Sequence, residues 1–123
     1  MENIKYINDD ILNASADVIV NASNGCGWMG GKRSATKKYK GIAESLNFKT
    51  NGTIEKEAMI KARKFKSISS VIYGKEPGSI FTTDPHGLNC KEVIHAVTMR
   101  YPGTFSRYKN VEKVLESIFK YCK

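Results

Sequence analysis

The sequence of 123 residues lacks most features that mark secreted, membrane-spanning or disulfide-rich proteins. Residues 1–5 are largely polar, so no signal peptide is expected. No apolar run has the length needed to cross a bilayer. The three cysteines, Cys26, Cys90 and Cys122, are odd in number and match neither a zinc spacing nor a disulfide framework. These absences predict a cytoplasmic chain with free thiols, no metal site and no membrane partner.

Proline is also scarce, with three residues against ten glycines, and 41% of the sequence is hydrophobic. This composition predicts one globular domain over residues 1–123. The net charge of +8, from 20 basic and 12 acidic residues, suits an anionic partner. The basic residues are densest at 32–40, either as a solvated helix face or as a binding surface. No arginine-rich tail or aromatic-studded RNA-binding signature is present, so nucleic acid is the weaker alternative.

The hydrophobic pattern alternates between strand-like and helix-like periods, which predicts an α/β fold. Continuous β-branched residues at 18–20 indicate a strand buried on both faces. The apolar stripe of the last helix needs a sheet to cover. The expected strands are 3–8, 17–21, around 71–73, 79–83 and 92–98, and the expected helices are 34–46, 54–66 (capped by Thr53) and 108–122.

Four of the seven residues at 25–31 are glycine, directly after the 17–21 strand. Ligands of α/β sheets bind at the carboxyl ends of strands, and such a loop can offer backbone N–H groups to an anion. The loop has neither the P-loop ending nor the dinucleotide-binding spacing, so its glycines serve either an anion or tight packing. Asn21 and Asn24 suit either ribose hydroxyls or turn formation. Asp10 either accepts an exocyclic amine or begins a turn.

Four segments together resemble the macro-domain family: Asp10-Ile11, the DVIVNASN run at 17–24, Met29-Gly30-Gly31, and the VIHAV run at 93–97. Their order and spacing are similar to those of small bacterial and bacteriophage members. The resemblance implies a three-layer α-β-α fold around a mixed sheet. It also implies that ADP-ribose, or an ADP-ribosylated substrate, is the partner, without a cofactor.

The resemblance assigns roles along the chain. Asp10 would accept a hydrogen bond from the adenine amino group, and the backbone of Ile11 would help to hold the base. Asn21 and Asn24 would line the side of the distal ribose, and Asn24 is the candidate for catalysis. Gly30, Gly31 and the nearby backbone would pack on the diphosphate and the distal ribose. Trp28 would either wall the pocket or pack beneath the loop, as would Met29. The implied ligand-binding residues are Asp10, Ile11, Asn21, Ala22, Asn24, Gly25, Met29, Gly30, Gly31 and Lys32. His95, inside a strand, is expected to be a structural histidine.

Two departures from the family pattern affect the expected function. Residues 30–34 read GGKRS, so the acidic residue that follows the glycines in the known hydrolases is absent. The family also continues past the last helix with a further strand and a second phosphate loop, which this sequence lacks. An open sheet edge is therefore expected, and with it a homo-oligomer or a marginal monomer. The alternatives to binding are an ADP-ribosyl hydrolase or ADP-ribose-phosphate phosphatase, and a degenerate macro fold that acts through protein contacts.

Overall fold

Strands and helices alternate along the chain, which confirms the predicted α/β class. The computed structural model describes residues 4–63 and 74–123. Its elements in chain order are the 3-10 turn η1 (Ile11–Asn13), β1 (Val18–Asn24), α1 (Gly31–Thr36), α2 (Ile42–Lys49), α3 (Thr53–Ala62), β2 (Ile80–Thr83), β3 (Glu92–Met99) and α5 (Tyr108–Tyr121). The strand predicted around 71–73 and the end of the 54–66 helix lie outside the described residues.

The three strands form one mixed sheet in the order β1-β3-β2. β1 runs parallel to β3, with Asn21 opposite His95, and β2 runs antiparallel to β3, with Phe81 opposite the same His95. Residues 93–97 of β3 are all buried, because the strand is central in the sheet and covered on both faces. The mixed sheet predicted from the sequence is therefore confirmed.

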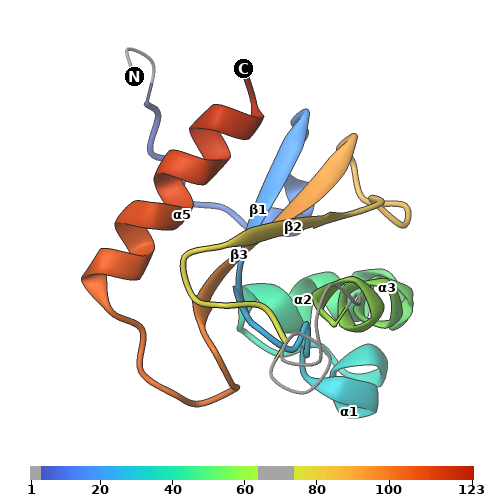
Figure 1. The fold of residues 1–123 in the computed structure, drawn as a ribbon. Coiled ribbons are helices and arrows are strands. Elements are labelled where there is room, and N and C mark those ends of the chain that lie inside the picture. The colour runs from blue at the N-terminus through green and yellow to red at the C-terminus, as the bar shows by residue number, and fades with distance from the viewer. Residues whose placement is uncertain (1–3, 64–73) are drawn as a thin grey trace.

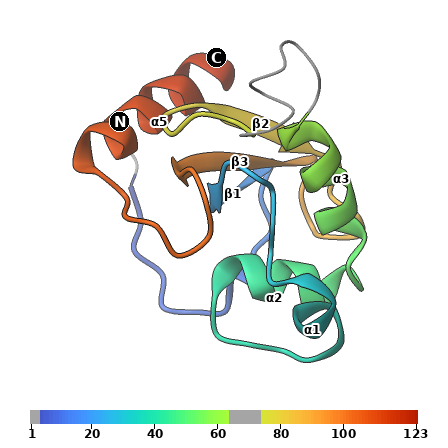
Figure 2. The same ribbon diagram turned by 60° about the horizontal axis from the view of Figure 1, so that its bottom comes forward.

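Helices cover both faces of the sheet, so the molecule has three layers (Figures 1 and 2). α5 packs against β3 and β2 on one face, while α2 and α3 pack against β1 and β2 on the other. Each interface has its own apolar cluster. On the α5 side the buried residues are Ile94, Ala96, Val114 and Ile118. On the other side they include Ile19, Met29, Leu46, Ile54, Val93 and Val97.

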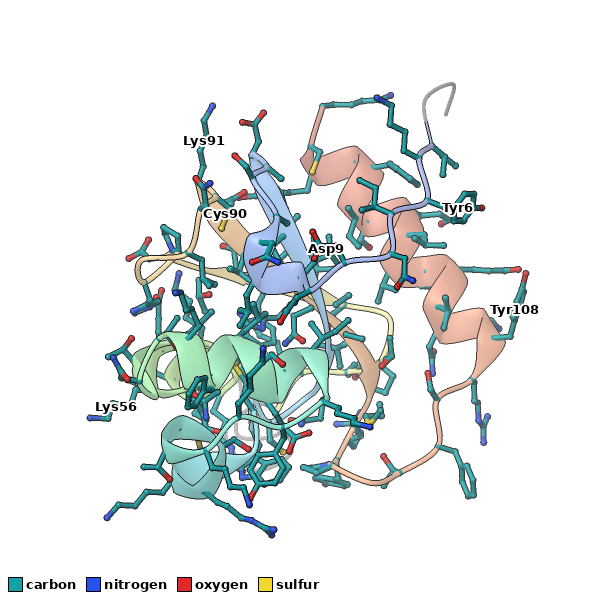
Figure 3. The ribbon with its side chains drawn as sticks, turned by 180° about the vertical axis from the view of Figure 1, so that it is seen from behind. Tyr6, Asp9, Lys56, Cys90, Lys91 and Tyr108 are labelled. Atoms are coloured by element: carbon teal, nitrogen blue, oxygen red, sulfur yellow. The ribbon has the colours of Figure 1, made fainter. Side chains whose placement is uncertain are left out.

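The strand predicted for residues 3–8 is wrong. Residues 4–8 belong to no helix or strand, and no described strand lies beside them to form a ladder. Their apolar side chains consequently face solvent, with Tyr6 96% exposed and Ile7 79% exposed. Figure 3 shows Tyr6 on the α5 side of the molecule and Asp9 at the following turn. A strand needs a partner, and a short alternating pattern cannot show that one exists.

The single helix predicted for residues 34–46 is two helices, α1 and α2, joined by residues 37–41. Lys37 ends α1 in an extended conformation, and Gly41 begins α2 as its N-cap. The basic joining segment has few apolar side chains to bury, so nothing holds a continuous helix onto the core. Gly52, with φ of 83°, is the N-cap of α3 in place of the predicted Thr53. A side-chain cap is replaced there by a left-handed glycine.

β1 is not buried on both faces, contrary to the prediction. Ile19 is 3% exposed, whereas its neighbour Val20 on the opposite face is 42% exposed. The reason is that α5 packs mainly against β3 and β2, and among the described residues of β1 only the partly buried Val18 packs against the apolar cluster on that face. The edge of β1 that faces away from β3 pairs with no strand among the described residues.

The remaining predicted elements are confirmed as β1, α3, β2, β3 and α5, with ends that differ by a few residues from the prediction. None of the helices in the described ranges is both long and apolar enough to cross a membrane. Cys26, Cys90 and Cys122 are all free thiols, and burial raises the pKa of the Cys90 thiol above its usual range.

Candidate functional site

The glycine loop leaves the carboxyl end of β1 and passes beside α2 to reach α1 (Figure 2). A Cβ atom on Gly25 would collide with the carbonyl oxygen of Lys75, and one on Gly27 would collide with that of Ala58 in α3. Gly27 also has φ of 75°, in the left-handed region. These two glycines therefore serve close backbone packing, which is one of the two uses that the sequence left open.

A buried carboxylate, Glu55 in the first turn of α3, holds the second half of this loop. Its Oε2 accepts hydrogen bonds from the backbone N–H groups of Met29, at 2.6 Å, and Gly31, at 2.8 Å. Asn47 adds a bond from its amide to the carbonyl oxygen of Gly31, at 3.1 Å. Two of the N–H groups expected to face an anion thus already have an acceptor inside the protein. Sequence reasoning missed this contact, because Glu55 lies more than twenty residues after the loop.

Asn24 closes the first half of the loop. Its Oδ1 accepts from the backbone N–H groups of Cys26 (3.0 Å) and Trp28 (3.2 Å), and its Nδ2 donates to the carbonyl oxygen of Trp28 (2.9 Å). Asn24 therefore makes the turn that was one of its two expected roles. A primary amide has two N–H donors, so one remains for a ligand.

Asn21 lies away from the loop, inside the sheet. It is fully buried, and its Nδ2 lies 3.2 Å from Nδ1 of His95. Nε2 of His95 lies 2.9 Å from the hydroxyl of Thr83, and Phe81 stacks on the imidazole ring. Burial lowers the pKa of His95 to about 4, so the ring is neutral, as a structural histidine should be. Asn21 lines neither of the two cavities described next.

A small cavity of about 180 Å³ opens beside the glycine loop. Trp28, about half exposed, lines it from the loop, and Glu44 lines it from the first turn of α2. Met29 also touches the cavity but is 1% exposed and packs into the core beneath the loop. The other lining residues are Ala22, Ser23, Asn24, Gly30, Ala43, Met99, Pro102 and Gly103. Sequence reasoning did not single out Glu44, which follows the glycine run by thirteen positions.

A larger cavity of about 820 Å³ lies between η1 and the segment that joins α1 to α2. Asp10 stands at its edge, where Oδ1 caps η1 by accepting from the N–H of Leu12 and Oδ2 forms a 2.6 Å ion pair with Lys38. The hydrogen bond from Lys38 is the main reason that the pKa of Asp10 is lowered. The cavity is lined by Asp9, Asp10, Ile11, Lys37, Lys38, Tyr39, Lys40, Ile42 and Ser45. Part of the basic patch thus lines a cavity.

The two cavities flank the N-terminal end of α2. Ile42 and Ser45 line the larger one, and Ala43 and Glu44 line the smaller one. Of the residues implied by the resemblance, Asp10 and Ile11 line the larger cavity, and Ala22, Asn24, Met29 and Gly30 line the smaller one. Asn21, Gly25, Gly31 and Lys32 line neither. Among the described residues, no group of three His, Cys, Asp or Glu side chains could hold a metal ion.

No protein-family model and no curated relative matches the sequence. Among solved structures, the fold is similar to the macrodomain of Mycobacterium tuberculosis DarG, with a TM-score of 0.68 at 19% identity. It is also similar to the macrodomain of Thermus aquaticus DarG, with a TM-score of 0.62 at 21% identity. Each likeness covers 94% of this chain and 65% of the other, so the chain spans less than two thirds of their length. The chain therefore has a macrodomain fold, as the sequence motifs predicted.

Proposed function

We propose that this chain binds ADP-ribose or a closely related ADP-ribosyl nucleotide. The observation that carries the proposal is the pair of cavities on either side of the N-terminal end of α2, in a macrodomain fold. The larger cavity, about 820 Å³, has the size of a small-molecule site and takes the adenosine half. The smaller one, about 180 Å³, takes the distal ribose. An elongated ligand with a group at each end suits two cavities that share a wall.

The charges around the larger cavity support an anionic ligand. Lys37, Lys38 and Lys40 line it, and their ammonium groups favour a diphosphate over a neutral group. The Asp10 carboxylate keeps acceptor capacity beyond its bonds to Lys38 and Leu12, because each carboxylate oxygen can accept two hydrogen bonds. It can therefore accept the adenine amino group as well. Across α2, the second amide proton of Asn24 can donate to a ribose hydroxyl.

A calorimetric titration of the purified chain with ADP-ribose, with AMP as the control ligand, tests the proposal. We expect saturable binding that is selective for ADP-ribose. Trp28 is the only tryptophan in the sequence and lines the smaller cavity, so its fluorescence should also change on binding. A folded sample that binds neither ligand would contradict the proposal and favour the alternative of a fold that acts through protein contacts.

Asp10→Ala should weaken ADP-ribose binding by about tenfold, because the amine of the buried adenine loses its acceptor. The matched control is Asp17→Ala, which removes the same charge from an exposed residue whose only described ion-pair partner is Lys91, at 3.5 Å. The measurement is the calorimetric dissociation constant of each variant, with circular dichroism to check the fold. Equal affinities of the two variants would place adenine elsewhere.

The salt dependence of binding separates a nucleotide pocket from a nucleic-acid surface. Displacing counterions from a polyanion makes affinity fall steeply with salt, whereas a single ADP-ribose contacts few cations. We therefore expect a shallow dependence for ADP-ribose and only weak, strongly salt-dependent binding of DNA or RNA oligonucleotides. If DNA or RNA oligonucleotides bind more tightly than ADP-ribose, nucleic acid is the alternative partner.

We also propose that the chain associates with a second copy through the open side of β1. Val20 of β1 is 42% exposed, and on the outer side of α5 Leu115 and Phe119 are each 47% exposed. An unpaired strand edge and exposed apolar side chains each favour pairing with another chain. Light scattering during size-exclusion chromatography should give at least a dimer, and Phe119→Glu should shift it towards the monomer. A monomer at every concentration would refute the association.

A further inference from the structure

We propose that the base site in the larger cavity accepts 6-oxopurines, such as hypoxanthine, as well as adenine, and that Lys38 is the residue that determines this breadth. The inference rests on the proposed binding of ADP-ribose and names the range of bases that the site takes. It is carried by the ion pair between Lys38 and Asp10 at the edge of this cavity.

Lys38 and Asp10 belong to opposite walls of the larger cavity. Asp10 is the N-cap of η1, and Lys38 lies in the segment that joins α1 to α2, 28 positions further along the chain. Nζ of Lys38 lies 2.6 Å from Oδ2 of Asp10, and both residues line the cavity. A base that uses Asp10 as its acceptor therefore also meets the ammonium group of Lys38.

The segment that carries Lys38 is anchored, although the lysine side chain itself is about half exposed. The carbonyl oxygen of Tyr39 accepts a hydrogen bond from the hydroxyl of Ser45 in α2, at 3.0 Å. The hydroxyl of Tyr39 accepts a further bond from Nε of Arg33, whose guanidinium carbon lies 5.0 Å from the centre of the tyrosine ring. These contacts hold the backbone next to Lys38 and so restrict where its ammonium group can reach.

Three groups at this edge of the cavity can contact the edge of a base. The backbone N–H of Ile11, the first residue of η1, is a donor, and it makes no hydrogen bond with another described residue. The Asp10 carboxylate is an acceptor. The ammonium group of Lys38 is a second donor, and Asp10 uses only one of its three N–H groups. The carboxylate therefore has one donor on its own wall of the cavity and another on the opposite wall.

Adenine and the 6-oxopurines present opposite patterns of donors and acceptors. Adenine has a donor, its amino group, next to an acceptor, N1, so it suits the Asp10 carboxylate together with the N–H of Ile11. A 6-oxopurine has an acceptor, O6, next to a donor, N1–H. Against the same two protein groups it would bring acceptor against acceptor and donor against donor, and all four groups would lose their partners. A site that offers only this carboxylate and this N–H therefore selects adenine.

Lys38 supplies the arrangement that a 6-oxopurine needs. Its ammonium group can donate to O6 while the Asp10 carboxylate accepts from N1–H, provided that the base shifts along the cavity towards Lys38. A cavity of about 820 Å³ leaves room for this shift. The apolar side chains of Ile11 and Ile42, which also line it, can pack against either base. Asp10 thus serves both kinds of base, whereas Lys38 is needed for the 6-oxopurine.

A purely structural role for the ion pair makes a different prediction. A pair between two partly exposed side chains contributes little to stability, and its loss would not distinguish one base from another. A general electrostatic role of Lys38 would not distinguish them either, because both nucleotides carry the same diphosphate. Lys40 lines the same cavity without an ion-pair partner among the described residues, so it represents this general role. Base selectivity is therefore the quantity to measure.

The test compares ADP-ribose with its inosine analogue, which differs only in the oxo group at C6 and the proton on N1. In calorimetric titrations of the full chain, the dissociation constant of the inosine analogue should be no more than about tenfold above that of ADP-ribose. Lys38→Met removes the donor and keeps a side chain of similar length. The ratio of the two constants should then rise by about tenfold, because O6 loses its partner. The Asp10 carboxylate stays ionised in this variant at neutral pH, since its ordinary pKa is 3.8.

Two further variants control for charge and for the shared acceptor, with circular dichroism to check that each is folded. Lys40→Met should weaken both nucleotides alike, and Asp10→Ala should also weaken both, because both bases use its carboxylate. An inosine analogue that binds the unmodified chain more than about tenfold more weakly than ADP-ribose would overturn the inference and leave the proposed function intact. The same ratio in Lys38→Met as in Lys40→Met would have that consequence too. Absence of binding by either nucleotide would overturn both the inference and the proposed function.

Discussion

Replacing Glu55 by alanine should lower the free energy of unfolding by about 3 kcal/mol. Glu55 is 9% exposed, and one of its oxygens accepts the backbone N–H groups of Met29 and Gly31, at 2.6 and 2.8 Å. Hydrogen bonds to a charged acceptor are the stronger kind, and alanine would leave both donors without this partner, the N–H of Met29 in a buried position and that of Gly31 in a partly buried one. The decrease in the free energy of unfolding should therefore be several-fold larger than for an ordinary surface substitution.

A graded series of variants tests whether this loss of stability comes from the hydrogen bonds that Glu55 accepts. Glu55→Gln retains an oxygen that can accept both N–H groups but removes the charge, so its loss should be intermediate. Glu116→Ala removes an exposed carboxylate from α5 and should change stability by less than about 0.5 kcal/mol. Urea unfolding followed by the fluorescence of Trp28, which lies in the same loop, measures all three. Equal stability of Glu55→Ala and Glu116→Ala would contradict the loop contact.

The second large effect is a loss of stability at acidic pH that originates at His95. Burial lowers the pKa of this ring to about 4 in the folded chain, against an ordinary value of 6.5, while nearby Glu57 raises it and Lys61 lowers it. The unfolded chain therefore binds more protons between these two values, and stability falls as the pH falls. The contribution is fully present above pH 6.5 and is lost on approach to pH 4. It amounts to about 3 kcal/mol in total.

The bonding of the ring explains why protonation is costly. With the Asn21 amide donating to Nδ1, the proton of neutral His95 is on Nε2, which donates to the hydroxyl of Thr83. A second proton, on Nδ1, would face the amide donor of Asn21 and bring a charge into the sheet. The neutral ring is therefore the form that the fold accommodates.

Two measurements check this pH dependence. An NMR titration of the imidazole Cε1–H should show that His95 stays neutral from pH 7 down to about pH 5. Unfolding free energies measured over the same range should fall with pH for the unmodified chain and more gently for His95→Gln. His86→Gln, at the chain's other histidine, is the control and should keep the steeper slope. Parallel curves for the two variants would contradict the assignment to His95.

Secondary structure was predictable where a residue pattern reflects burial directly. The β-branched residues of β1 and the apolar run of β3 indicate strands, and the regular apolar stripe of α5 indicates a helix. The errors fall where the outcome depends on a partner. Residues 4–8 alternate like a strand but have no neighbouring strand among the described residues, and Val20 is exposed because α5 packs mainly against β3 and β2.

The residues of the candidate site also divide into those that a local motif indicates and those that depend on tertiary contacts. Asp10 and Asn24 could be proposed from motifs, because each belongs to a short segment whose order along the chain is informative. Glu44 and Glu55 could not, because both appear in the sequence only as acidic residues at helix starts, which usually serve the helix itself. Folding brings α2 and α3 against the glycine loop and turns these two carboxylates towards it.

The sequence by itself determined the alternation of strands and helices, the strand β3 with its buried centre and the position of the glycine loop after β1, because these follow from local patterns of burial and conformation. Only the tertiary structure decided that Asn21 turns inward to His95, that Glu55 holds the loop and that Glu44 lines a cavity. Contacts of this kind join residues 24 or more positions apart or set the direction of a side chain, and they depend on how layers pack rather than on neighbours in the chain.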